Sequence, residues 1–497
     1  MSRATFSTAL TGVDDKTLRE HLLRRDGQED ICFALWFPSS GRSRTTALIN
    51  KVLLPLPGER TVHGNVSFNP SFLERALTEA AASGAGVALL HSHPRGRRWQ
   101  GMSPDDINTE TAIAASVYGA TNLPLLGLTL AGDGTWSSRF WRRVAPRKYE
   151  RFDCATVRVV SEELRISFHD RLAPPPKANA QQVRTVAAWG ELAQADLTRL
   201  RVGVIGAGSV GGMIGEALAR IGIEDVMLID FDKIEEHNLD RLLYAIRADI
   251  GHLKVNVMAK HLTARATAST WRVEPIVDAV YTGTGFRAAL DCDVLFSCVD
   301  RPWGRYVLNL IAYAHLIPVF DGGISVRMNR LGKIAAADWK AITAAPGRQC
   351  LQCAGQYDPG LVQMEREGFL DDPSYISGLP QGHPLKAREN VFAFSMGCGN
   401  LQLLQMLAMV IAPLEQPNAG EQLYHFVGNT MEEPKFGECH LECQFPSLIA
   451  RGDSSDIEAT LPSGTNQRVF SAILRRRGKR SISLRFCRDD ELVRASG

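Results

Sequence analysis

The sequence predicts an α/β protein whose largest part is a nucleotide-binding domain with a mostly parallel sheet. The prediction rests on the stretch from Arg201 to Arg241. It begins with an apolar strand, Val202 to Ile205, and continues through a glycine-rich turn into an amphipathic helix that ends near Arg220. A second strand, Val226 to Ile229, follows. Strands that alternate with a helix in this way are typical of a parallel sheet.

The glycine-rich turn has the spacing of a phosphate-binding loop. Gly206 and Gly208 allow the backbone to turn tightly and approach a phosphate, and Gly211 allows the helix to pack against the strand. The amides at the helix N-terminus would then face the anion. Asp230 ends the second strand, where a carboxylate can bond a ribose hydroxyl. The stretch therefore predicts a nucleotide site.

The residues after Asp230 favour a triphosphate over a dinucleotide. Asp232, Asn238, Asp240 and Arg241 form a polar cluster that a hydride-transfer site does not require. We therefore expect ATP rather than a nicotinamide cofactor.

Length and composition exclude some classes of protein. A chain of 497 residues suggests about three domains, and a net charge of +2 argues against an obligate nucleic-acid binder. We see no apolar leader and no apolar run long enough to cross a bilayer, so we expect a cytoplasmic protein without a membrane partner. Ten cysteines, some in close pairs, favour metal binding or free thiols over a disulfide framework.

The first domain, residues 1–147, is expected to hold a metal site. The stretch from Gly86 to Pro94 has the pattern of a buried strand ending in His91 and His93, whose side chains point to the same side because strand side chains alternate. Ser103 and Asp106 lie about one turn apart at a predicted helix start. The two histidines and Asp106 would bind one zinc ion and leave a fourth position for water. The structural alternative is that Ser103 simply caps the helix.

The rest of the chain divides into three further parts. Residues 148–180 are expected to form a linker, because three consecutive prolines in LAPPPKANA favour an extended chain that spaces the flanking domains apart. Residues 181–450 form the predicted nucleotide-binding domain. Residues 451–497, with a basic cluster around Arg475, are expected to form a small β-rich appendage.

Two close pairs of cysteines follow the nucleotide-binding motifs. Four thiolates can close a tetrahedral zinc site, so the pairs predict a structural zinc, with a buried pair of free thiols as the alternative. The pairs are Cys350 with Cys353 and Cys439 with Cys443.

The segments DFDKIEEHNLDR, GHLKVNVMAK and VLFSCVDRPWGR resemble those of the ThiF, MoeB and ubiquitin-activating superfamily, over roughly residues 181–446. The resemblance implies a Rossmann-like ATP-binding domain that adenylates a carboxylate. It assigns the ribose to Asp230, the phosphates to Asn238 and Arg241, the triphosphate to Lys254 and the magnesium ion to Asp300. Solvated surface charge is the alternative for Arg241 and Lys254.

Arg184, upstream of these motifs, also matches the superfamily. It resembles the arginine that members extend across a twofold dimer into the partner's nucleotide site. The resemblance therefore implies a homodimer.

The pattern HSHP followed by GMSPDD resembles the JAB/MPN (JAMM) metalloprotease family, many of whose members remove ubiquitin-like proteins from their conjugates. This implies an α+β domain with zinc on His91, His93 and Asp106, and Ser103 beside the oxyanion. The family's glutamate general base matches Glu29, with Glu59 as the next candidate. The RGRRWQG loop is two residues longer than usual in the family, so we expect a different substrate groove.

Together the two resemblances imply one enzyme with two activities on a ubiquitin-like protein. One half would adenylate its C-terminal carboxylate with ATP and Mg²⁺, and the other would process or deconjugate it with Zn²⁺. This suits a bacterial ubiquitination-like pathway with a conjugating enzyme as a further partner. The alternatives are sulfur-carrier activation for thiamine or molybdopterin-type biosynthesis, and a regulatory module without catalysis.

The sequence also bears on how the adenylate leaves. Many ubiquitin-activating relatives carry a catalytic cysteine after the first zinc pair, but no thiol lies between Ala354 and Gly397. Cys398 follows in an apolar segment that predicts a core helix, and burial suppresses thiolate formation. We therefore expect no thioester on this chain. The adenylate would pass to a partner's nucleophile or, as a weaker alternative, through a hydroxyl near His383, such as Ser374 or Ser377.

Overall fold

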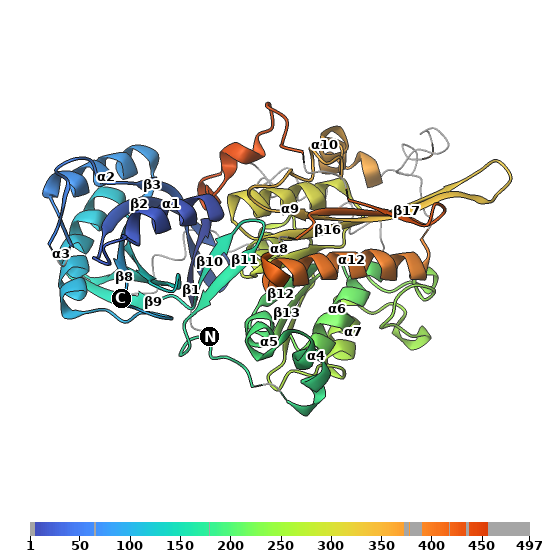
Figure 1. The fold of residues 1–497 in the computed structure, drawn as a ribbon. Helices are drawn as coiled ribbons and strands as arrows, with labels where there is room; N and C mark the ends of the chain where they lie inside the picture. Colours follow the sequence, from blue (N-terminus) through green and yellow to red (C-terminus); the bar gives the residue numbers. More distant parts are fainter. Residues whose placement is uncertain are drawn as a thin grey trace.

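Two large β-sheets organise the chain in the computed structural model (Figure 1). The model describes residues 5–63, 66–177, 179–371, 377, 390–416, 418–433 and 437–455. We call residues 5–168, which build the first sheet, the amino-terminal unit, and residues 179–455, which build the second, the carboxy-terminal unit. Of the predicted appendage, residues 456–497 lie outside the described residues.

The first sheet is mixed, with the strand order β11-β10-β1-β3-β2-β6-β7-β8-β9. Its strands are β1 (Thr5–Thr11), β2 (Ile31–Ser40), β3 (Arg44–Leu53), β6 (Gly86–His93), β7 (Leu125–Ala131), β8 (Trp136–Ala145), β9 (Lys148–Asp153), β10 (Thr156–Val160) and β11 (Leu164–Phe168). A small hairpin joins β4 (Arg60–Val62) and β5 (Val66–Phe68), and three helices accompany the sheet, α1 (Gly12–Leu22), α2 (Pro70–Ser83) and α3 (Pro104–Thr121). The predicted buried strand with the two histidines is β6, at the middle of the sheet.

The predicted linker, residues 148–180, is largely part of this sheet, so that prediction is wrong for its first two thirds. β9 pairs with β8, and β10 pairs in parallel with β1 at the other side of the sheet. Every residue of β10 is buried, which is why it pairs instead of bridging two domains. After β11 the described chain continues through residues 169–177, which contain no helix or strand, toward the carboxy-terminal unit.

The second sheet has the order β14-β13-β12-β15-β16-β17-β18-β19. The pairs from β14 to β16 are parallel, as predicted, whereas β17, β18 and β19 add antiparallel pairs that the sequence did not indicate. The strands are β12 (Arg201–Ile205), β13 (Asp225–Ile229), β14 (Arg272–Ile276), β15 (Val294–Ser297), β16 (Val319–Met328), β17 (Ile334–Ala344), β18 (Glu421–His425) and β19 (Thr430–Glu432).

Helices cover both faces of this sheet, and alternate residues of β12 show why. Val202 and Val204 pack into a core cluster with the helices α6 and α12, while Ile205 packs into the cluster on the other face with α8 and α9. The helices of this unit are α4 (Val183–Trp189), α5 (Glu191–Thr198), α6 (Ser209–Ile221), α7 (Lys254–Thr263), α8 (Gly283–Ala289), α9 (Pro302–Ala314), α10 (Pro359–Arg366) and α12 (Phe392–Ile411). The strand order reverses between β12 and β15, the place where open α/β sheets bind ligands.

The helix α12 is the one helix in the described part of the chain that is long and apolar enough to cross a membrane. More than half of its apolar window, 56%, is buried inside the protein. Burial of that extent is typical of a core helix.

The two units are packed together. The expectation that the proline-rich segment spaces the flanking domains apart is therefore wrong. Leu48, Val160 and Phe168 of the amino-terminal unit belong to the same buried cluster as Leu197 of α5. Figure 1 shows β10 and β11 at the side of the first sheet that faces the carboxy-terminal unit. Gly452, near the end of the described chain, lies so close to the amino-terminal unit that a Cβ there would meet the Pro38 carbonyl at 2.2 Å.

Candidate nucleotide and metal sites

An open cavity of about 1130 Å³ lies at the carboxyl ends of β12, β13 and β15. Eight of the predicted nucleotide-site residues line it: Gly206, Gly208, Asp230, Asp232, Asn238, Arg241, Lys254 and Asp300. Residues that are far apart in the sequence therefore meet at one place, the point where the strand order reverses.

The glycine turn has the close approaches that its residues predict. Gly206 has φ +101°, and a Cβ there would meet the Cys298 carbonyl oxygen at 2.4 Å. Gly211 does not line the cavity; its Cβ would meet the Gly206 oxygen at 2.0 Å, so glycine permits the helix to pack against the turn. Ser209 begins α6, and its buried hydroxyl has no hydrogen-bond partner among the described residues. An orphaned hydroxyl at a helix N-terminus is suited to a phosphate oxygen.

Asp230 braces this turn from the end of β13. Its Oδ2 accepts a hydrogen bond from the Ala207 amide at 2.8 Å, and its Oδ1 accepts one from the Asp232 amide at 2.7 Å. Burial raises the pKa of Asp230, and the Lys254 ammonium opposes that shift. Each oxygen keeps a second lone pair, so the contacts are compatible with a ribose hydroxyl.

Two of the cations that line the cavity are Lys254, the first residue of α7, and Arg241, in the turn after β13. The Lys254 Nζ lies 3.1 Å from the Asp232 Oδ2, and only 13% of its side chain is exposed. The Arg241 Nη1 donates to the His237 carbonyl at 2.6 Å and lies 2.9 Å from the Asp240 Oδ1. Both cations are thus held at the cavity wall by local carbonyl or carboxylate groups, in a lining that favours an anionic ligand.

Asp300 follows β15 and is exposed to the cavity. A second carboxyl group, Glu365 of α10, also lines the cavity; burial, together with the nearby Asp300 charge, raises its pKa to about 7. Arg184, in contrast, is an exposed residue of α4 and does not line the cavity. The structure therefore brings together the predicted nucleotide-site residues of one chain without Arg184.

In the amino-terminal unit, His91, His93 and Asp106 form a compact cluster. The Asp106 carboxylate lies 3.4 Å from the His91 Nε2 and 3.5 Å from the His93 Nε2. Donor atoms on a tetrahedral zinc ion with bonds of about 2.1 Å lie about 3.4 Å apart, so the three side chains fit such an ion. Burial lowers the pKa of His91 to about 3, which keeps its imidazole neutral, the form that binds a metal.

The remaining predicted residues of this site lie around the cluster. Ser103 caps α3, because its Oγ accepts from the Asp106 amide at 3.1 Å while its own amide donates to the Asp106 carboxylate at 2.8 Å. Burial raises the pKa of Glu29, the charge of His93 opposes that shift and the charge of Asp106 adds to it. Glu59, the other candidate base, forms an ion pair with Arg75, with 2.6 Å between Oε2 and Nη2. This contact gives Glu59 a structural role.

The four paired thiols also come together. All four Sγ atoms lie within 4.8 Å of one another, and those of Cys350 and Cys443 are 3.7 Å apart. Tetrahedral zinc bonds of about 2.3 Å place two sulfur atoms about 3.8 Å apart. The Cys350 amide donates to the Cys439 sulfur at 3.3 Å, a contact that stabilises a thiolate. The residues Cys350, Cys353, Cys439 and Cys443 therefore fit a structural zinc ion.

The comparison with known families agrees with the site in the carboxy-terminal unit. A model of the ThiF family matches residues 180–444, more than half of the chain. The chain belongs to the ThiF family. The match leaves out the amino-terminal unit, so membership concerns the nucleotide-binding half.

Several curated proteins are similar to part of this ThiF-family chain. Adenylyltransferase and sulfurtransferase MOCS3 of Arabidopsis thaliana is 32% identical over 116 residues, 23% of this chain and 25% of that protein. Ubiquitin-like modifier-activating enzyme 5 of Drosophila pseudoobscura pseudoobscura is 29% identical over 134 residues, 25% of this chain and 34% of that protein. The tRNA threonylcarbamoyladenosine dehydratase of Escherichia coli is 33% identical over 112 residues, 22% of this chain and 42% of that protein. The chain thus spans less than half the length of each of these relatives.

Among solved structures, that of E. coli MccB with ATP is similar to this chain with a TM-score of 0.41 and 17% sequence identity. The superposed part covers 54% of this chain and 74% of the MccB chain.

Sequence reasoning missed several residues that line the cavity of this ThiF-family chain. Arg305 of α9 lies there, with its Nε 3.2 Å from the buried Asp321 and its Nη2 donating to the Gly322 carbonyl at 2.9 Å. Glu365 and Arg301 were missed too. The segment DRPWGR carried a signal for the two arginines, because it places them about one turn apart directly after Asp300.

Proposed function

We propose that the carboxy-terminal unit adenylates the C-terminal carboxylate of a ubiquitin-like protein, with ATP as the second substrate. The observation that carries the proposal is the single cavity in which Asp230, Lys254 and Asp300 face the glycine turn. The names of two relatives, a ubiquitin-like modifier-activating enzyme and an adenylyltransferase, support the same reaction.

In this reaction a carboxylate oxygen of the substrate attacks the α-phosphorus of ATP, the bond to the β-phosphate oxygen breaks, and pyrophosphate leaves. Negative charge that builds on the phosphates would be neutralised by Lys254 and Arg241. Asp230 and Asn238 would orient the ribose and the phosphates, and Asp300 would hold Mg²⁺, which supplies further charge neutralisation. The helix α6 would direct its first amides at the phosphates.

Arg184 would complete the site from a partner subunit in a twofold homodimer. Its exposure on α4 and its place outside this chain's own cavity support action on another copy.

For the amino-terminal unit we propose a zinc-dependent peptidase activity on the same ubiquitin-like protein or its conjugates. His91, His93 and Asp106 would hold Zn²⁺, which acts as a Lewis acid toward the substrate carbonyl. Glu29 would take the proton of the attacking water and pass it to the leaving amine. Ser103 accepts a bond from a backbone amide, so its hydroxyl hydrogen would be free to face the oxyanion.

We place these two activities in the cytoplasm, in a bacterial ubiquitination-like pathway with a conjugating enzyme downstream. Sulfur-carrier activation for thiamine or molybdopterin-type biosynthesis is the second candidate, which the similarity to a sulfurtransferase-fused adenylyltransferase favours. Neighbouring genes for a conjugating enzyme or for a sulfur-transfer pathway would decide between them.

The test of adenylation is ATP–pyrophosphate exchange with a purified ubiquitin-like protein. The wild-type protein should exchange label, and Asp300→Ala should abolish exchange while its thermal unfolding stays unchanged, because the residue is exposed. Asp196→Ala, a change of an exposed carboxylate on α5, is the matched control and should exchange normally. Tight ATP binding without exchange for any ubiquitin-like protein or sulfur carrier would instead favour a regulatory module.

A further inference from the structure

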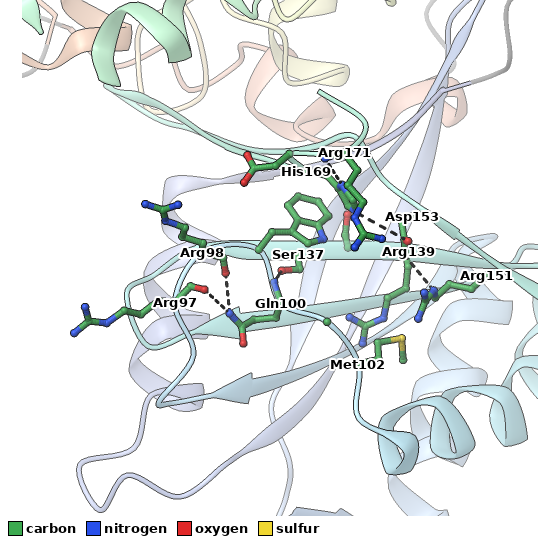
Figure 2. A pocket seen from close by; sticks show the side chains of 14 residues that line it. Arg97, Arg98, Gln100, Met102, Ser137, Arg139, Arg151, Asp153, His169 and Arg171 are labelled. Atoms are coloured by element: carbon green, nitrogen blue, oxygen red, sulfur yellow. Dashed lines mark hydrogen bonds and ion pairs between the residues drawn. The ribbon is translucent and has the colours of Figure 1, made fainter. Parts of the chain in front are cut away.

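A second cavity, of about 500 Å³, lies in the amino-terminal unit (Figure 2). One wall is formed by residues 97–102, the part of the chain where the loop between His93 and Ser103 is longer than expected. The opposite wall comes from β8, β9 and residues 169–171, which follow β11. A cavity of this size accommodates a few residues of a peptide.

Backbone amides of the loop wall, residues 97–102, donate hydrogen bonds that fix its position. The Arg98 amide donates to the Asp133 carboxylate at 2.7 Å, and the Gln100 amide donates to the Ser137 Oγ at 2.6 Å. The Trp99 ring lies 5.0 Å from the His169 ring, which joins the two walls. Because these contacts hold the loop, the cavity exists before any ligand binds.

Gln100 connects this cavity to the candidate metal cluster. Its Oε1 lies 3.4 Å from the His93 Nδ1, and its Nε2 donates to the carbonyls of Arg97 and Arg98 at 2.8 and 2.9 Å. A ligand that lies against residue 100 is therefore next to a predicted zinc ligand.

The lining has an excess of positive charge. Its five arginines are Arg97, Arg98, Arg139, Arg151 and Arg171, and its two carboxylates are Asp153 and Asp170. Asp153 is paired with Arg151 at 3.2 Å, and Asp170 lies 3.8 Å from Arg199 outside the cavity. Arg139 is neutralised by the buried Glu110.

Three of these arginines, Arg97, Arg98 and Arg171, are exposed and have no ion pair among the described residues. In Figure 2 Arg98 extends on one side of Gln100, while Arg171 gathers with His169 and Asp153 on the other side of the view. The cavity therefore offers cationic groups from two segments of the chain, together with the apolar surface of Trp99 and Met102.

We propose that this cavity binds an acidic side chain, Asp or Glu, of the peptide substrate that reaches the candidate zinc cluster. The proposal rests on the proposed peptidase function of the amino-terminal unit. In this proposal the substrate carboxylate pairs with Arg171, which follows β11. Adjacent aliphatic parts of the substrate lie on Trp99, so the longer loop contributes to substrate specificity.

The test uses the full-length protein and two short fluorescent peptides that differ only in a central Glu or Gln. Fluorescence anisotropy should show that the wild-type protein binds the Glu peptide about fivefold more tightly, and that the preference shrinks as salt is added. Arg171→Gln should remove most of the preference. Because Arg171 is exposed, this variant should still fold. Arg143→Gln, an exposed arginine of β8 outside the cavity, is the matched control and should keep the preference.

The outcomes separate the two proposals. A protein that prefers the Glu peptide but cleaves neither peptide with added Zn²⁺ overturns the peptidase function and leaves the binding site standing. Equal binding of both peptides overturns the site, even where cleavage occurs. If inorganic phosphate binds at Arg171 and the Glu peptide does not, the cavity takes free anions, and the assignment to a peptide is wrong.

Discussion

Arg158 of β10 and Asp293, which directly precedes β15, form an ion pair in which neither side chain is appreciably exposed, with 2.9 Å between Nη1 and Oδ1. The same carboxylate oxygen lies 2.6 Å from the Arg44 Nη1, and the other oxygen accepts from the Arg201 amide at 2.9 Å. Burial alone would raise the pKa of Asp293, but the two guanidinium groups hold it below its usual value. One carboxylate thus bonds both units.

We therefore expect Asp293→Ala to destabilise the whole molecule. Removal of one partner leaves Arg158 and Arg44 with uncompensated buried charge, which costs about 3–5 kcal/mol. Urea unfolding followed by tryptophan fluorescence and by circular dichroism should show both units unfolding together at a lower midpoint. Asp26→Ala, which removes an exposed pair with Arg24, should shift the midpoint little. A wild-type midpoint for Asp293→Ala would contradict the role of this pair.

A second contact between the units predicts a pH dependence of stability. His315 is buried, its Nδ1 lies 2.8 Å from the Ser39 Oγ, and burial lowers its pKa to about 4. The unfolded chain binds a proton at this histidine near pH 6.5, whereas the folded protein does not until about pH 4. The stabilisation that comes from keeping His315 neutral is therefore fully present above pH 6.5 and is lost as the pH falls toward 4.

The measurement is the melting temperature at pH 7.5 and at pH 5 for the wild type and for His315→Gln. We expect a smaller acid-induced drop in the variant, because Gln does not titrate and can still bond Ser39. Equal drops would show that other groups dominate this pH range.

The candidate peptidase centre predicts different effects for a ligand and a base. Glu29→Ala should keep bound zinc and lose cleavage by about 10²-fold or more, because a general base is not a ligand. His91→Ala should lose both, since it removes one of three donors. Zinc content by mass spectrometry of metals and cleavage of a ubiquitin-like fusion are the two readouts. Cleavage at the parental rate by Glu29→Ala would show that another carboxylate is the base.

Arg184 predicts complementation between subunits. Arg184→Ala and Lys254→Ala should each be inactive in pyrophosphate exchange, and a mixture should regain part of the activity, because one of the two sites in a mixed dimer is intact. Mass spectrometry of the mixture verifies that mixed dimers form. Mixed dimers without exchange would falsify action across the interface.

The thiol Cys398 should be dispensable for chemistry. It lies in α12 and is fully buried, and burial raises its pKa to about 12, so almost no thiolate forms at neutral pH. We expect Cys398→Ala to retain exchange and transfer within about twofold, the size of a packing change. A thiol-reducible adduct with the ubiquitin-like protein that disappears in this variant would make Cys398 catalytic. Of the alternative hydroxyls, Ser377 is exposed, and Ser374 and His383 lie outside the described residues.

The glycine turn shows what the sequence predicts well. The strand expected at Val202 to Ile205 is β12, Arg201–Ile205, because local spacing of apolar residues and glycines determines both its ends. The residues on the loops that follow β13 and β15 could also be placed, since carboxyl ends of parallel strands meet at one edge of a sheet.

The predicted linker shows where the sequence falls short. β10 pairs in parallel with β1, and β11 pairs with β10, so the assignment depends on contacts between distant segments that no local pattern contains. The same limit applies to Asp293 and Arg158, because their ion pair forms only when the two units pack together. Arg305 was missed because a lone arginine on a helix is usually solvated.

Among the described residues, the chain leaves the amino-terminal unit through residues 169–177, where Pro174 and Pro175 are exposed. Because the units share a buried cluster and the Asp293 ion pairs, a protease that cuts there would leave two fragments that still elute as one particle. A shortened gene that ends at residue 147 would instead remove β9, β10 and β11 from the first sheet. The buried cluster and the ion pairs, rather than the connecting peptide, would therefore hold the two fragments together.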